Sequence, residues 1–288
     1  MKTAFLNNYF RGKEMKFTCS IFFLLFICIS CTNYRYINAA FPPNNPYFTK
    51  KGDSKITAYY STNADARPAK QYAYGVDLQA AYAVGNHWAL TASYFNRKEK
   101  DVYSSSYNIY DSSIVHYTRN LFDVGAGYFF SFNAEKTLTA NFYAGLANGK
   151  FLFHDDGLDR NQAGYKRYYE STITKWYLQP SVNFMPLDYF HMAFATKVSF
   201  VHYGKIKSSY TTDELEYFSL NKVANKTLTF VEPSFDFQVG LPSLPGINLD
   251  ILFSAINNAH REGSHISVRG SNFSIGLNID LSKIKKRK

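Results

Sequence analysis

The sequence predicts an all-β protein, namely an antiparallel up-and-down transmembrane β-barrel of about ten strands. Three observations lead to this prediction. Apolar and polar residues alternate with a period of two along many segments, which is the period of a strand with two different faces. The connections between these segments are alternately long and short, as in barrels of the outer membrane. No apolar run after residue 31 reaches the ~20 residues that a membrane helix needs.

Residues 75–95 show the repeating unit most clearly. Val76, Leu78 and Tyr82 lie at even positions up to residue 84, while the odd positions hold polar or small residues. After Gly85 and Asn86 the alternation resumes and continues to residue 95. A tight turn between two antiparallel strands explains both halves of this pattern.

The same pattern predicts strands near residues 55–62, 71–84, 87–97, 113–131, 136–149, 168–184, 190–203, 226–240, 247–256 and 265–281. The long polar connections are residues 63–70, 98–112, 150–167, 204–224 and 257–264. The short connections, rich in Gly, Pro and Asn, are residues 85–86, 132–136, 186–189 and 241–246. A soluble sandwich has no reason to place all its long loops at one end. The alternation therefore favours a membrane barrel with short periplasmic turns and long external loops.

In such a barrel the apolar faces contact lipid and the polar faces line the lumen. Two prolines interrupt the predicted strands. Pro180 and Pro233 occupy positions where proline cannot donate a ladder hydrogen bond. We expect a β-bulge at each of them.

The N-terminal region reads as an export signal followed by a linker. Residues 1–14 are a possible start-site extension, because Met15 opens a signal peptide over residues 15–30 with Lys16 and an apolar run over 21–29. Cys31, preceded by Ser30, is the expected site of lipidation; the alternative is ordinary cleavage near residues 39–40. Residues 31–53 lack periodicity and are expected to form a lipid-anchored tether to a barrel over 54–282, with a basic tail at 283–288.

Four stretches carry a resemblance to a known group. They are the lipobox-like start, PNNPYFTKKGD at 43–53, DLQAAYAVGNH at 77–87 and the closing GLNIDLS at 276–282. Together they resemble uncharacterised lipobox-bearing outer-membrane β-barrel proteins of Bacteroidota-type bacteria. The resemblance implies a barrel fold and an outer-membrane location, but no chemistry. The chain departs from outer-membrane barrels in ending IKKRK rather than on an aromatic residue, which shifts the expected assembly signal inward to Leu281.

Charge and cysteine usage narrow the possible partners. Most of the formal charge of +10 lies before residue 31 and in the tail, and basic residues do not interleave with aromatics along a stripe. We therefore expect no nucleic-acid partner. The three cysteines are at positions 19, 28 and 31, so the mature chain is expected to form no intramolecular disulfide.

The parity of the strands predicts a polar cluster in the lumen, formed by Asp77, Asp123, Lys175, Lys197, Glu232, Asp236, Asp250 and Asp280. One interpretation is a narrow cation-favouring path or a ligand cavity. The other is a set of hydrogen bonds and ion pairs that fills a small barrel, because buried charges must be paired. The second is favoured, since barrels of about eight strands are just filled by side chains.

Catalytic chemistry has weak support. His154, Asp155, Asp156 and Asp159 fall in a predicted external loop and are expected to be solvated, because their spacing fits no standard calcium loop. A surface hydrolase at the outer rim would draw on His116, His154, Asp155, Asp156, Asp213 and His260, but nothing in the spacing pairs them. We expect no catalytic residues, metal site or cofactor.

The predicted function is a structural or interaction role in the cell envelope, as an outer-membrane lipoprotein with both termini in the periplasm. The expected partners are outer-membrane lipid and another protein of the cell envelope. The alternatives are a narrow channel for small solutes or cations, and a soluble lipid-tethered β-barrel whose apolar faces point inward around a small apolar ligand. A surface hydrolase is the least favoured.

Overall fold

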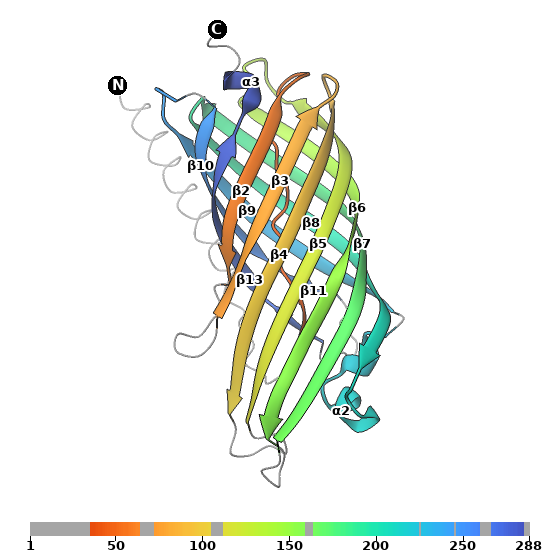
Figure 1. The fold of residues 1–288 in the computed structure, drawn as a ribbon. Coiled ribbons are helices and arrows are strands. Elements are labelled where there is room, and N and C mark those ends of the chain that lie inside the picture. The colour runs from red at the N-terminus through yellow and green to blue at the C-terminus, as the bar shows by residue number, and fades with distance from the viewer. Residues whose placement is uncertain are drawn as a thin grey trace, which may run out of the picture. The chain divides into compact units, whose positions relative to one another are not determined.

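Ten long strands close into one antiparallel barrel in the computed structural model, which describes residues 35–63, 72–104, 112–158, 164–224, 226–244, 246–259 and 266–284 (Figure 1). Each strand pairs with the next along the chain, and the last long strand pairs with the first. The predicted fold class, a closed antiparallel barrel of about ten strands, is confirmed.

The barrel strands are β2 (Ser54–Thr62), β3 (Tyr72–Ala83), β4 (Trp88–Ser104), β5 (Ser112–Ser131), β6 (Leu138–Leu158), β7 (Gly164–Leu187), β8 (Phe190–Ser208), β9 (Thr227–Gly240), β10 (Ile247–Ala255) and β13 (Ser271–Ile279). Shorter elements are β1 (Tyr36–Ala39), β11 (Asn257–Asn258), β12 (Ser267–Arg269), α2 (Thr212–Tyr217), the 3-10 helix η1 (Leu220–Lys222) and α3 (Leu281–Ile284). The pairs β9–β10, β10–β13 and β13–β2 close the ring.

Apolar side chains point out of the barrel and polar ones point in. On β3, for example, Val76 is 50% exposed whereas Asp77 is 2% exposed. On β6 the outward residues from Leu138 through Phe142 to Leu146 are apolar, a span of about nine residues that is enough to cross a bilayer as a tilted strand. This arrangement is that of a transmembrane barrel. It does not fit the alternative of a soluble barrel with its apolar faces inside.

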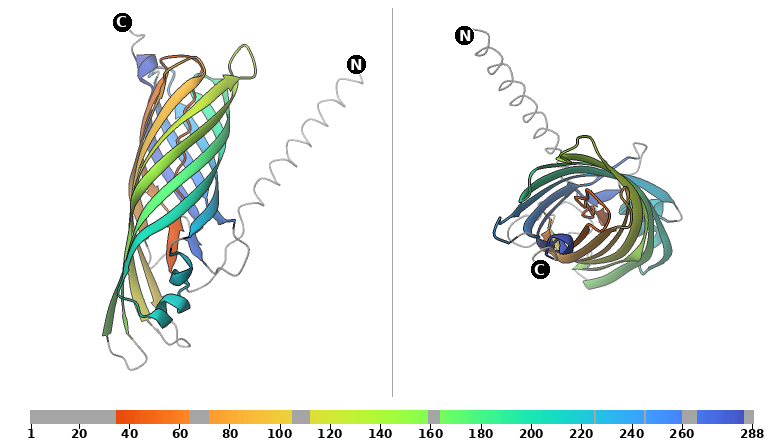
Figure 2. Two further views of the ribbon diagram at one scale, coloured as in Figure 1. Left: turned by 90° about the vertical axis from the view of Figure 1, so that its right-hand side faces the viewer. Right: turned by 90° about the horizontal axis from the view of Figure 1, so that it is seen from above.

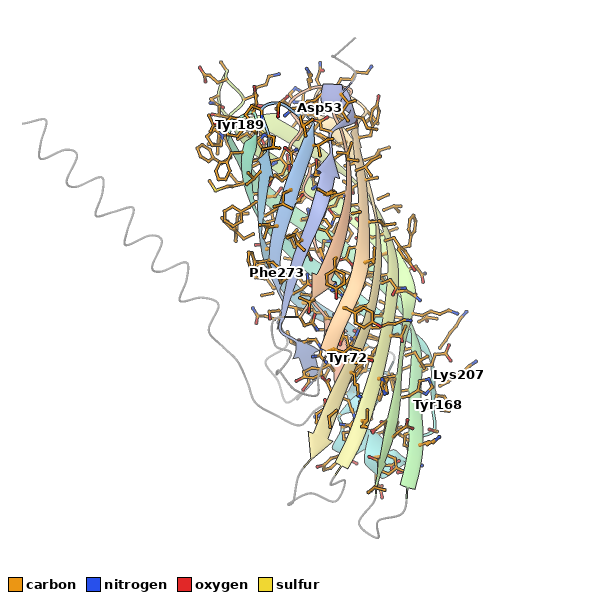
Figure 3. The ribbon with its side chains drawn as sticks, turned by 60° about the vertical axis from the view of Figure 1, so that its left-hand side comes forward. Asp53, Tyr72, Tyr168, Tyr189, Lys207 and Phe273 are labelled. Carbon is orange, nitrogen blue, oxygen red and sulfur yellow. The ribbon has the colours of Figure 1, made fainter. Side chains whose placement is uncertain are left out.

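Aromatic side chains mark the two edges of the apolar band, as is usual in outer-membrane barrels. The ring centroids of Trp88 and Tyr128 lie 5.4 Å apart near the short turns. Figure 3 shows Tyr189 at the same end of the barrel and Tyr72 nearer the other. None of the described helices is long and apolar enough to cross a membrane.

Strands β4 to β8 extend well beyond the others at the end with the long connections (Figure 1, bottom). They contain 17, 20, 21, 24 and 19 residues, against 9 in each of β2, β10 and β13. The expected strand ends at 97 and 149 are therefore wrong. Pairing between β5 and β6 continues to Ser112 and Leu158, because the inner face of the extension packs on buried aromatic residues.

Neither proline produces the predicted bulge. Pro180 pairs with Phe142 and Pro233 with Thr196 in an uninterrupted register. On the β7–β8 side, Gln179 and Pro180 are not paired, and Leu178 and Ser181 on either side of them pair with β8 in the same register. Each proline thus removes a donor from the ladder without inserting an extra residue.

Residues 35–48, which belong to the segment expected to be a tether, lie inside the barrel. β1 pairs in parallel with β12 near the long connections, and residues 40–48 then run through the lumen (Figure 2, right). At the far end, the Gly52 amide donates to the Ala83 carbonyl beside a short turn. Arg35 and Ile284 therefore lie at opposite ends of the barrel. The periplasmic location of both termini stays a prediction. The termini themselves lie outside the described residues, as does Cys31.

Candidate functional site: the occupied lumen

Residues 35–48, here called the plug, are held in the lumen by side chains of the barrel wall. Gln179 Nε2 donates to the Asn44 carbonyl at 3.0 Å, and both Asn141 and Asn183 donate to the Pro46 carbonyl at 3.2 and 3.0 Å. Asn44 Nδ2 in turn donates to the Ala80 carbonyl at 2.9 Å. The part of the plug that follows β1 has no strand partner among the described residues, and its backbone groups must be satisfied in this way because no water shell is available to a buried chain.

Three ion pairs lie in the lumen beside the plug. Lys175 Nζ lies 2.7 Å from Glu232 Oε1, and Lys197 Nζ lies 3.5 Å from Asp123 Oδ2. The third joins Arg97 Nη2 to Asp77 Oδ2 at 3.3 Å. The structure thus brings together most of the predicted lumen cluster, with seven members buried inside the barrel: Asp77, Asp123, Lys175, Lys197, Glu232, Asp236 and Asp250. The eighth, Asp280, follows β13 at the rim of the barrel and accepts hydrogen bonds from Ser282.

Close packing between the backbones of β5 and β6 positions Asp123, the partner of Lys197. Tyr177 donates from its hydroxyl to Asp123 Oδ1 at 2.8 Å. Its ring reaches Asp123 across Gly125 and Gly145, which face each other on β5 and β6. A Cβ atom at Gly125 would lie 2.6 Å from the Tyr177 hydroxyl, so these glycines are needed for the approach.

At the end with the long connections, three arginines and three acids form a second layer, here called the cap. Arg269 lies 2.7 Å from Glu99 and 2.5 Å from Asp101, and Arg119 lies 2.5 Å from Glu99. The remaining pair joins Arg35 of the plug to Asp155 of β6 at 2.6 Å. These pairs adjoin a buried cluster that includes Tyr117, Phe151, Phe153, Tyr169, Tyr210 and Phe218.

The connection between β8 and β9 folds over the cap. Tyr210 donates to Asp155 Oδ2 at 2.6 Å, and Phe218 lies 4.3 Å from the Arg35 guanidinium carbon. Helix α2 is fixed by a capping box at Thr211 and by Glu214, which accepts hydrogen bonds from Arg167 at 3.1 to 3.2 Å. Burial opposes ionisation of Glu214, but the bonds from Arg167 and Thr211 outweigh it and lower the pKa of this carboxyl group.

The end with the short turns is open. A cavity of about 540 Å³ enters the barrel there and ends against Tyr47 and Phe48 of the plug. Its other lining residues are polar or charged in large part and include Lys50, Asp53, Lys55, Glu135, Lys136, Asp188, His191, Gln238, Asn248, Asp280 and Lys283. The lumen therefore has a filled section and a vestibule rather than a uniform bore.

The candidate catalytic residues do not form one site among the described residues. His116 and His154 face each other on the outer surface of β5 and β6, whereas Asp155 points inward to the cap. The expected solvated loop at 154–156 is part of β6, and Asp213 lies on α2. Asp159 and His260 lie outside the described residues. The described part of the chain contains no group of three or more His, Cys, Asp or Glu residues able to hold a metal ion.

Several residues that hold the lumen were missed in the sequence: Arg35, Arg97, Glu99, Asp101, Arg119 and Arg269. Glu99 and Asp101 were assigned to a loop and Arg35 to the tether. The available signal is the alternation in the sign of the charge over residues 98–101, Lys-Glu-Lys-Asp, whose acids at odd positions continue the inward face of β4 past the predicted end of the strand.

Comparisons with known proteins bear on the fold alone. No protein-family model and no curated protein sequence matches the chain. Among solved structures, the translocator domain of the autotransporter NalP from Neisseria meningitidis matches with a TM-score of 0.49 and 6% identity, over 80% of this chain and 88% of that one. The outer-membrane protease OmpT of Escherichia coli matches with a TM-score of 0.40 and 9% identity, over 80% and 96%. The attachment invasion locus protein Ail of Yersinia pestis gives 0.29 and 12%, over 80% and 99%. The relation of the chain to the lipobox-bearing group stays a prediction.

Proposed function

We propose that this protein is a closed outer-membrane barrel that does not conduct solutes and acts as a structural or interaction component of the cell envelope. The observation that supports this proposal is the occupied lumen. The plug and the paired charges fill the section between the vestibule and the cap. A conducting path would need mobile water and ions there, whereas buried, mutually paired charges act as fixed cross-links.

The extension of β4 to β8 is the interaction surface that we propose. Beyond the apolar band its outer face carries Lys98, Lys100, Lys150, Lys166 and Lys207 (Figure 3 labels Lys207 beside Tyr168). Only two outward acids interrupt them on these strands, Asp156 and Glu170. Lys98 and Lys150 lie four residues past Tyr94 and Leu146, at which the continuous run of outward apolar residues ends on β4 and on β6. This is about 10 Å above the band for a tilted strand, at the level of lipid headgroups.

We place the long connections on the external side, as in other barrels of this architecture. With that orientation the plug enters from outside and its end at Phe48 faces the periplasm. Lipidation at Cys31 is part of the same proposal, as is the envelope partner. The partner is expected at the extension, because this is the part of the barrel wall that lipid does not cover.

Conductance across planar bilayers tests the proposal. The purified full-length protein, folded in detergent and inserted, is expected to give no steady single-channel steps. A variant lacking residues 35–48 is expected to give them, and Asp156→Asn on the outer surface serves as a control that leaves the bilayer silent. Stable conductance of the unaltered protein would contradict a closed barrel and favour the alternative of a narrow channel.

A further inference from the structure

Five oxygen atoms without a hydrogen-bond partner meet at the inner end of the vestibule. They are Oδ1 and Oδ2 of Asp236, Oδ1 of Asp250, and the hydroxyls of Tyr47 and Tyr59. Both carboxyl groups are 0% exposed and Tyr59 is 2% exposed. A buried polar atom without a partner costs free energy, so five in one place call for an explanation.

These groups converge from three parts of the chain. Asp250 pairs with Gln238 and Asp236 with Leu252, so the two acids are diagonal neighbours on the inner faces of β9 and β10, within reach of each other. The carboxyl group of Asp236 faces Asp250 and Tyr47, and the hydroxyl of Tyr59 faces Asp250.

Gly276 of β13 lies between Tyr59 and Asp250, opposite each of them. A Cβ atom there would lie 2.7 Å from the Tyr59 ring, so a glycine leaves room for the ring beside the acids. The two tyrosines and the two acids therefore form one pocket of oxygen atoms.

The charges of this pocket do not balance. Lys55 Nζ lies 3.8 Å from Asp250 Oδ2 and also donates to the Asn45 carbonyl at 3.1 Å. Gln238 supplies a neutral donor to Asp250 Oδ2 at 2.7 Å. Among the described residues no ion pair reaches Asp236. With both acids ionised, two carboxylates and one lysine carry a net charge of minus one, and an uncompensated buried charge is strongly destabilising.

We propose that Asp236, Asp250, Tyr47 and Tyr59 bind a monovalent metal cation, with Na⁺ as the probe. Carboxylate and hydroxyl oxygens are the ligands that hard cations prefer, and a single positive charge balances the pocket. The cation reaches it from the vestibule, whose lining includes Tyr47, Lys55 and Gln238. Since Tyr47 belongs to the plug, binding joins the lower end of the plug to the barrel wall.

Thermal unfolding of the full chain in detergent, followed by tryptophan fluorescence, tests this site. The unfolding temperature is compared in NaCl and in N-methylglucamine chloride at equal concentration, because a ligand that binds only the folded state raises it in proportion to ln(1 + [L]/Kd). We expect a saturable rise with Na⁺ for the unaltered protein. Asp236→Asn and, separately, Asp250→Asn are expected to abolish that rise while remaining folded in N-methylglucamine chloride.

Asp188→Asn is the matched control, because Asp188 lines the mouth of the same cavity but lies outside the pocket. It is expected to keep the Na⁺ response. Equal unfolding temperatures in the two salts for the unaltered protein would overturn the proposal and show that the two carboxyl groups share a proton instead. A Na⁺ response that survives both Asp→Asn substitutions would overturn it as well, by showing that the cation binds elsewhere.

Discussion

The two ends of the lumen are built in opposite ways. At the cap, every acid of the network has an arginine within 2.7 Å, and aromatic rings exclude water around them. At the vestibule, Asp236 has no basic partner among the described residues, and a polar cavity of about 540 Å³ lies beside it. The barrel is therefore sealed at the end with the long connections and accessible at the other. At the cap, arginine side chains neutralise the buried acids. At the vestibule, we propose that a cation from the solvent does so.

Breaking the cap is expected to have the largest effect. Glu99→Gln removes the partner shared by Arg119 and Arg269 and leaves two guanidinium groups without their full counter-charge. We expect a loss of about 3 to 5 kcal/mol in the free energy of unfolding, the usual result of removing one partner from a buried ion pair. Urea unfolding in detergent measures it.

The exposed Asp156→Asn on the neighbouring strand is the control, with an expected change within about 0.5 kcal/mol. At the other end of the lumen, Asp236→Asn is expected to cost less than Glu99→Gln, because it removes an acid that no arginine or lysine neutralises. A cost of Glu99→Gln no greater than that of Asp156→Asn would contradict the description of the cap as a cross-linked seal.

Filling the space beside Tyr177 is expected to lower the free energy of unfolding by an intermediate amount. Gly145→Val would place a Cβ atom within about 2.5 Å of the Tyr177 ring and its hydroxyl, and push this side chain away from Asp123. We expect a loss of about 1 to 3 kcal/mol, typical of overpacking. The same urea titration measures it. Gly164→Val, at a glycine with no atom within 4 Å of an added Cβ, should leave the midpoint almost unchanged if crowding is the cause.

Acidification is expected to cause the smallest loss of stability, and this loss is confined to the connection between β8 and β9 that covers the cap. The folded state lowers the pKa of Glu214 beneath its usual value of 4.5, so its contribution to stability is complete above about pH 4.5 and is lost as the pH falls through the lower, folded value. The pair with Arg167 lies near the surface, so we expect a loss of about 1 kcal/mol or less.

Hydrogen exchange of α2 at pH 6 and after a brief acid pulse measures this loss of protection. Glu214→Gln is expected to show the weakened protection already at pH 6. If acid loosens the unaltered protein and Glu214→Gln equally, another group controls the connection.

The transmembrane part of the fold could be predicted from the sequence because lipid outside and polar groups inside impose one alternation on every strand. Val76 and Asp77 illustrate it, and the same parity located the inward acids of the lumen. The extension of β4 to β8 was not predicted because the alternation of apolar outward and polar inward residues reverses beyond the membrane. There Lys98 and Lys150 face water while Phe151 faces the core, and a polar outward residue resembles the beginning of a loop.

The plug could not be predicted because its conformation is determined by partners far away in the sequence. Asn44 and Pro46 are held by amides of β7, more than a hundred residues later. A segment with prolines and no periodicity reads locally as a linker. The only sequence signal for the plug is the number of inward amide side chains, such as Gln179 and Asn183. In the structure these amides donate hydrogen bonds to backbone carbonyls of the plug.

Thiol cross-linking of the plug tests the central claim most directly. Asn45 Oδ1 accepts from Gln179 Nε2 at 3.0 Å, so the Cβ atoms of the two residues are separated by the length of both side chains, which is too far for a direct disulfide. The pair Asn45→Cys and Gln179→Cys in a background without the native cysteines should therefore be joined in the folded protein by a short bifunctional thiol reagent. Asn45→Cys with Asp156→Cys, on the outer surface, should not. The occupied lumen predicts rapid, fold-dependent cross-linking of the first pair alone. Absence of that cross-link, together with labelling of the thiol introduced by Asn45→Cys by a water-soluble maleimide as fast as in unfolded protein, would contradict it.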